Sequence, residues 1–120
     1  MSMRMLLVLG VVGLTAFGAL GADQENTIKD VMKQAHDRQA ELLGKVTGGN
    51  ASKEEKEQLQ KLYEDLAKNK PPKGAAQAWK SKTDAMVAAA KSVVKGDQGA
   101  EVKLKNTVNC MACHNAHRAN

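Results

Sequence analysis

Apolar residues recur at intervals of three and four along most of the chain after residue 24, with charged residues between them. This spacing places the apolar side chains on one face of an α-helix. The pattern stops at three clusters rich in glycine, proline and asparagine, at 48–50, 69–74 and 96–99. We therefore predict four amphipathic helices, over about 24–46, 52–68, 75–95 and 100–117, and no strand.

Each predicted helix carries one apolar stripe, and the stripe of the fourth ends on a histidine. The positions expected to face inward are Ile28, Met32, Ala35, Leu42, Val46, Leu59, Leu62, Tyr63, Leu66, Trp79, Thr83, Met86, Ala90, Val93, Leu104, Thr107 or Val108, Met111 and His114. Short connections favour antiparallel neighbours, so the fold class is all-α, an antiparallel up-down-up-down four-helix bundle. In that topology the start of the first helix lies near the end of the fourth.

Residues 1–21 have the pattern of a secretory signal peptide, with Arg4 before an apolar run from Met5 to Ala22. We predict cleavage before Ala22 or Asp23, which leaves one domain over 22–120. An uncleaved membrane anchor is the alternative, since 18 apolar residues are borderline for a span. The prediction is an exported protein, periplasmic in a bacterium.

The charge and composition of the remaining chain restrict its partners. The formal charge is +5, or +4 without Arg4, and the basic residues form no block, so we predict no nucleic-acid partner. The chain has one Trp, one Tyr and one Phe, and Phe17 lies in the signal segment. The core must therefore be aliphatic and rich in alanine, and a bulky cofactor would supply the missing apolar surface.

The last helix contains Cys110-x-x-Cys113-His114, the pattern of a c-type haem attachment site. Two thiols add to the two vinyl groups of a haem and leave thioether bonds. Residues three apart are neighbours on a helix, so both sulfurs reach one edge of the macrocycle. His114 follows directly and becomes an axial ligand of the iron. Covalent attachment of this kind takes place outside the bacterial cytoplasm, in agreement with the signal segment.

Two other chemistries use similar residues. A thioredoxin-like pair should open a helix after a strand, whereas Cys110 and Cys113 lie near the end of a predicted helix. Zinc bound by these cysteines with His114 and His117 would need four ligands from eight residues of one helix, which cannot surround an ion. We expect His117 to be partly exposed.

In layout and motif the chain resembles the class II cytochromes c, the cytochrome c-prime family. These proteins combine four helices with Cys-x-x-Cys-His near the C-terminus. The ending Cys113-His114-x-x-His117-Arg118 resembles the family's Cys-His-x-x-aromatic-Arg pattern, with His117 where an aromatic ring is commoner. The resemblance covers the mature chain in layout, but only the last helix in specific residues. It implies one covalent haem c near the C-terminal helix.

The resemblance also bears on the sixth iron ligand. In the low-spin branch of the family a methionine of the first helix closes the site, and Met32 stands at a similar position. In the high-spin branch the site is open and binds small gases. Three alternatives stay open here: Met32 as ligand, His36 one turn further on, or an open position with Met32 serving only as core packing. The resemblance favours the Met-ligated branch.

The expected function is electron transfer between redox partner proteins. No catalytic base, nucleophile or substrate cleft is evident in the sequence, so we predict no enzyme. The alternatives are a five-coordinate protein that binds NO or CO, and a haem-stapled structural or assembly module of a respiratory complex. A homodimer is compatible with each. Arg38 and Arg118 are candidates to pair with a haem propionate.

Overall fold

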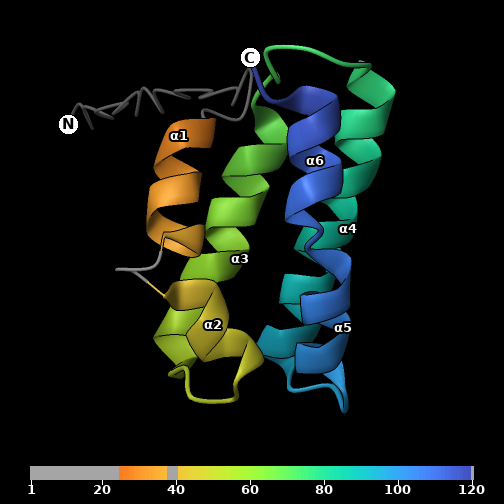
Figure 1. Cartoon of the computed structure of the whole chain (residues 1–120). Helices are drawn as coiled ribbons and strands as arrows, with labels where there is room; N and C mark the ends of the chain where they lie inside the picture. The colour runs from red at the N-terminus through yellow and green to blue at the C-terminus, as the bar shows by residue number, and fades with distance from the viewer. Residues whose placement is uncertain (1–24, 38–40, 120) are drawn as a thin grey trace, which may run out of the picture.

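The computed structural model describes residues 25–37 and 41–119, which form helices joined by short connections and include no strand (Figure 1). The all-α prediction is confirmed. The predicted signal peptide and Arg38 lie outside the described residues. Within the described ranges, no helix has the length and apolar character needed to cross a membrane. In chain order the elements are α1 (Ile28–Val31), the π-helix η1 (Met32–His36), α2 (Leu42–Thr47), α3 (Lys53–Lys68), α4 (Ala76–Lys95), α5 (Ala100–Thr107) and α6 (Cys110–His117).

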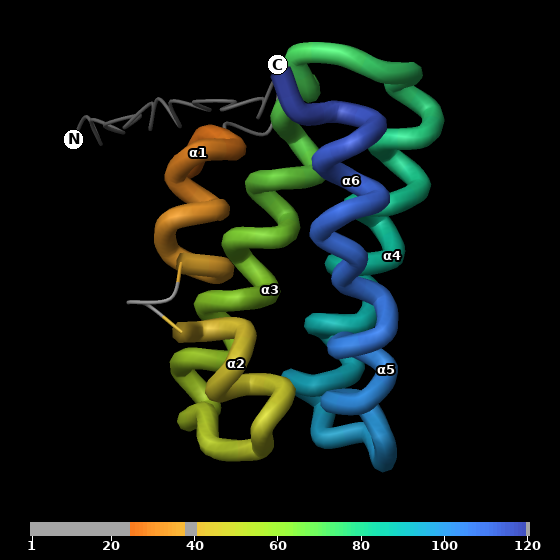
Figure 2. The backbone as a smooth tube through the Cα atoms, viewed as in Figure 1, coloured from red at the N-terminus to blue at the C-terminus, as the bar shows by residue number. Residues whose placement is uncertain are grey.

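Successive parts of the chain run in alternating directions. In the tube view the chain descends through α1 and α2, rises through α3, descends through α4 and rises again through α5 and α6 (Figure 2). The most extensive packing contact is between α3 and α4. In addition, α5 packs on α4, and α2 contacts both α3 and α5. As a result α1, the α3–α4 connection and the end of α6 lie at one end of the molecule (Figure 1).

Side-chain caps mark the starts of α1 and α3. The Ser52 hydroxyl accepts a hydrogen bond from the Glu55 amide at 3.1 Å, and the Glu55 carboxylate accepts one from the Ser52 amide at 3.1 Å. Together Ser52 and Glu55 form a capping box, the pattern Ser-x-x-Glu at a helix start. Thr27 and Asp30 form a second capping box at the start of α1. The two boxes satisfy backbone N–H groups that a helix start otherwise leaves unpaired.

The first predicted helix, 24–46, is not continuous, and the prediction is wrong in this respect. Helical geometry ends at Asp37, whose ψ is 141°, and resumes at Leu42 after Glu41, whose φ of 47° is left-handed. Between His36 and Leu42 only Ala40 is apolar. The sequence between them therefore offers little apolar surface to stabilise a helix by packing, and neither Asp37 nor Glu41 is α-helical.

The fourth predicted helix, 100–117, is also broken. Val108 and Asn109 are extended, and the Asn109 side chain caps α6 by accepting a hydrogen bond from the Ala112 amide at 3.0 Å. Asparagine competes with helical hydrogen bonding in this way. Because of the break, the residues that face the core in α6 do not continue the apolar stripe of α5. Leu104 is buried as predicted, but Met111 is 68% exposed and His114 is exposed, so their placement in the core is wrong.

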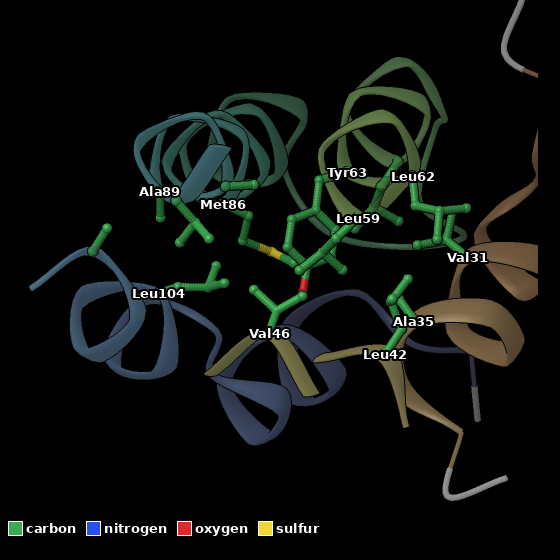
Figure 3. Packing of buried hydrophobic residues seen from close by; sticks show 14 of the residues in the cluster. Val31, Ala35, Leu42, Val46, Leu59, Leu62, Tyr63, Met86, Ala89 and Leu104 are labelled. Carbon is green, nitrogen blue, oxygen red and sulfur yellow. The ribbon is translucent and has the colours of Figure 1, made fainter. Parts of the chain in front are cut away.

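The core is aliphatic, as predicted, with Tyr63 and Trp79 as its aromatic members. Every position predicted to face inward from α3 and α4 is buried. Figure 3 shows the side chains of Met86 and Val46 pointing toward Leu59 and Tyr63. The side chains that α1 and η1 bury, Val31 and Ala35, are small. The packing of this segment is therefore thinner than that of α3 on α4.

Candidate functional site

A cleft of about 630 Å³ opens between the α1–η1 segment and α6. Its walls are Ile28, Lys29, Met32, Lys33, His36 and Asp37 on one side and Cys113, His114, His117, Arg118 and Ala119 on the other, with Pro72 and Trp79 between them. The main packing contact of α6 is with α4 rather than with α1 or η1. The cleft therefore separates the first and last helical segments at the end of the molecule where α1 lies.

The cleft brings together three of the four predicted site residues. Met32 comes from η1, and Cys113 and His114 come from α6. Cys110 is exposed and lines a second cavity of about 500 Å³. Both cavities are lined by His36 and Asp37, so the second adjoins the first. The four residues thus surround one continuous region of the surface.

The π-helical turn of η1 determines what the first segment presents to the cleft. A π-helix closes its hydrogen bonds one residue later than an α-helix, which widens the turn. With more residues in each turn, side chains four positions apart point in more nearly the same direction than they do in an α-helix. Met32 and His36, the two candidates for the sixth ligand, consequently both line the cleft.

His36 is engaged by a buried hydroxyl. Its Nε2 lies 2.9 Å from the hydroxyl oxygen of Tyr63, and the two rings are 5.7 Å apart. Burial lowers the pKa of His36, and the nearby His114 lowers it further. Burial also raises the pKa of Tyr63, with a further contribution from Cys110. Both groups are therefore favoured in their neutral forms, and Nε2 of His36 is committed to Tyr63.

Cys110 and Cys113 open α6 instead of lying near the end of a long helix, so the positional argument against a thioredoxin-like pair is wrong. Other observations weigh against that chemistry. No strand precedes the pair in the described part of the chain. Burial raises the pKa of Cys113, Cys110 adds to the effect, and Lys82 offsets part of it. Reactive dithiols need a lowered pKa.

Zinc is not supported by the arrangement of side chains. Across residues 25–37 and 41–119, no three histidine, cysteine or acidic side chains lie close enough together to hold a metal ion.

His117 is buried, at 2% exposure, and the expectation that it is partly exposed is wrong. Its ring meets Trp79 edge to face, with centroids 5.2 Å apart. Nδ1 lies 3.1 Å from the Lys73 carbonyl oxygen and donates to it, which leaves Nε2 to accept from Lys82 Nζ at 3.3 Å. His117 thereby holds α6 against α4 and the α3–α4 connection.

We expect Gly74→Ala to destabilise the fold through His117. Gly74 has φ of 90°, and a Cβ there would lie 2.5 Å from His117 Nδ1 and 2.6 Å from the Ala116 carbonyl oxygen. Gly96 has φ of 77° with no atom near its Cβ position, so Gly96→Ala measures the backbone strain alone, about 1–2 kcal/mol. In urea unfolding Gly74→Ala should lose about 1–3 kcal/mol more than Gly96→Ala. Equal losses would show that His117 shifts without cost.

The lining of the cleft fits a flat apolar group with an anionic edge. Trp79 lines the cleft, and its buried Nε1 has no hydrogen-bond partner among the described residues. Lys29, Lys33 and Arg118 line it too, against the single carboxylate of Asp37. The imidazole of His114 and the thioether of Met32 are of the kinds that ligate haem iron, and the thiol of Cys113, with that of Cys110 in the adjoining cavity, can bond to haem vinyl groups. These soft groups are unsuited to a hard, oxygen-seeking cation. The residues present are therefore compatible with haem c.

No family model, curated protein or solved structure matches this chain. The likeness to class II cytochromes c stays a prediction, resting on the helical layout and on the residues of α6.

Proposed function

We propose that this protein is an exported c-type monohaem cytochrome that transfers electrons between redox partner proteins. In this proposal the fold is the antiparallel four-helix bundle of the class II cytochromes c. The broken first segment, α1 to α2, and the broken last segment, α5 to α6, each take the place of one helix. The supporting observation is the cleft, which has Met32 on one wall and Cys113 and His114 on the other.

The residues of α6 would hold the haem. Cys110 and Cys113 are one turn apart at the start of the helix, so both thiols can bond to one edge of the group. His114 is exposed to the cleft, and its side chain makes no hydrogen bond with another described residue. Its imidazole is therefore available as an axial ligand. When bound, the haem iron supplies a one-electron couple.

Met32 is the better candidate for the sixth ligand. His36 would have to give up its bond to the buried Tyr63 hydroxyl before Nε2 could reach a metal. The Met32 thioether has no such competing bond, and its side chain is half-buried at the wall of the cleft. Methionine opposite histidine raises the reduction potential of haem iron, which suits an electron carrier.

The cations of the cleft would receive the propionates. The edge of a haem that carries the propionates lies opposite the edge that carries the vinyl groups. Lys29, Lys33 and Arg118, which form the positively charged rim of the cleft, would offer positive charge to these carboxylates. Lys29 and Lys33 are one turn apart on that rim, and neither they nor Arg118 form an ion pair within the described ranges.

Extraction and intact mass of the purified protein test the proposal. Acidified organic solvent should leave the haem on the polypeptide, because thioether bonds survive acid. The intact mass should equal the chain without its first 21 or 22 residues plus one haem. Haem that extracts freely, or a mass without haem from cells that mature other c-type cytochromes, would refute the central proposal.

A further inference from the structure

The start of the first helical segment is tied to α3 by four polar side chains, which we call the N-terminal clamp: Asn26, Gln34, Asp65 and Asn69. Asn26 Nδ2 donates to Asp65 Oδ2 at 2.8 Å, and Gln34 Nε2 donates to Asn26 Oδ1 at 2.8 Å. Asn69 Nδ2 donates to the Asn26 carbonyl oxygen at 2.9 Å and to the Asp65 carbonyl oxygen at 2.8 Å. Two of these bonds link residues about 40 positions apart in the chain.

The clamp is built around a buried charge. Asp65 is 1% exposed and is the one buried carboxylate in the described part of the chain. A buried carboxylate is costly unless it is paired, so Asp65 strongly favours the position of Asn26 that satisfies it. Lys61 Nζ lies 4.0 Å from its other oxygen and 3.3 Å from the Glu25 carboxylate. Residues 25 and 26 are thus both attached to α3.

Met32 lies inside the segment that the clamp closes. Gln34, two residues after Met32, bonds back to Asn26, six residues before Met32. The buried side chains between Asn26 and Asp37 are only Val31 and Ala35, which are small, and the helix ends at Asp37. Ile28 and Met32 also pack partly against the core, and His36 bonds to Tyr63 of α3. The clamp adds to these contacts the bonds that fix the start of the segment on α3.

We propose that Asn26 and Gln34 are positioning residues, which hold the Met32 thioether toward His114 across the cleft. This inference rests on the proposed function. A loosened clamp lets η1 shift, so that Met32 spends a larger fraction of time off the iron, although the iron and His114 are untouched. The consequence is a change in ligation that is separate from any change in global stability.

The experiment compares Gln34→Ala with Gln60→Ala in the haem-loaded protein. Gln60 Nε2 donates to Glu64 Oε1 at 2.9 Å, so both variants remove one amide hydrogen bond of similar length, but the Gln60 bond stays within α3. The readouts are the weak far-red band of a Met–Fe(III) bond, the rate at which the reduced protein combines with CO, and the thermal midpoint. Because CO binds only after Met32 leaves, Gln34→Ala should combine with CO about two- to tenfold faster. Gln60→Ala should match the wild type.

A second variant, Asn26→Ala, removes two bonds of the clamp and leaves Asp65 without its amide donor, so its effect should exceed that of Gln34→Ala. Since Gln34 is exposed, Gln34→Ala is expected to fold even where Asn26→Ala does not. A wild type with the far-red band, but with Gln34→Ala and Gln60→Ala equal in band and CO rate, would overturn the clamp alone. A wild type without the band that combines rapidly with CO would overturn both the clamp and the Met32 ligand.

Discussion

Replacing Cys110 and Cys113 together by alanine is expected to leave a chain with weak helicity and a broad thermal transition. The buried side chains are mainly alanine, valine and leucine, with Tyr63 and Trp79 as the aromatic members. A chain of about 100 residues buries only a modest core, so the loss of a covalent staple should weigh heavily on its stability. Here the cleft separates α6 from the α1–η1 segment, so a covalent haem would bridge the two. Circular dichroism of the purified variant, as a function of temperature, measures the loss.

Met111→Ala is the matched control for the double cysteine variant. Met111 lies between the two cysteines on α6 and is largely exposed, so its removal should change neither haem attachment nor the melting curve. A cooperative, fully helical double cysteine variant would show that the apolar stripes suffice without the cofactor. That result would not refute covalent haem attachment, which extraction and intact mass test separately.

Met32→Ala is expected to convert the iron from low-spin to high-spin and to abolish the far-red Met–Fe(III) band. Met32 faces His114 across the cleft, and His36 is held by Tyr63. Without a thioether on the sixth position, the reduced protein should bind CO freely. If Met32 occupies that position about 99% of the time, its removal raises the apparent affinity about 100-fold. Optical spectra in both oxidation states and CO titration measure these changes.

Two variants separate the alternatives for the sixth ligand. Met86→Ala removes a methionine buried in α4, so it should cost stability while the far-red band stays. His36→Ala should also keep the band, although it breaks the bond to Tyr63. A low-spin wild type that lacks the band and loses low-spin iron in His36→Ala would identify His36 as the ligand. A wild type that is already high-spin would make Met32 a packing residue and favour the gas-binding function.

The two long helices, α3 and α4, which pack on each other and on further helices, were the easiest to predict. The spacing of Leu59, Leu62 and Leu66 and the capping box at Ser52 are local signals, and α3 forms where they indicate. The same holds for α4, which ends at Gly96. Long amphipathic stripes of this kind leave a helix one way to bury its apolar face, so the local pattern and the tertiary fold agree.

The sequence by itself determined the all-α class, the helices α3 and α4, the aliphatic core, and the motif Cys110-x-x-Cys113-His114 with Met32 as a possible partner. These depend on the period of apolar residues and on residue type, which are local properties. Only the tertiary structure decided the breaks after His36 and Thr107, the burial of His117, and the bond between His36 and Tyr63. The last two depend on partners from distant parts of the chain. The imidazole of His117 can be buried because it contacts Trp79, Lys73 and Lys82. The spacing of apolar residues along the sequence does not reveal such partners.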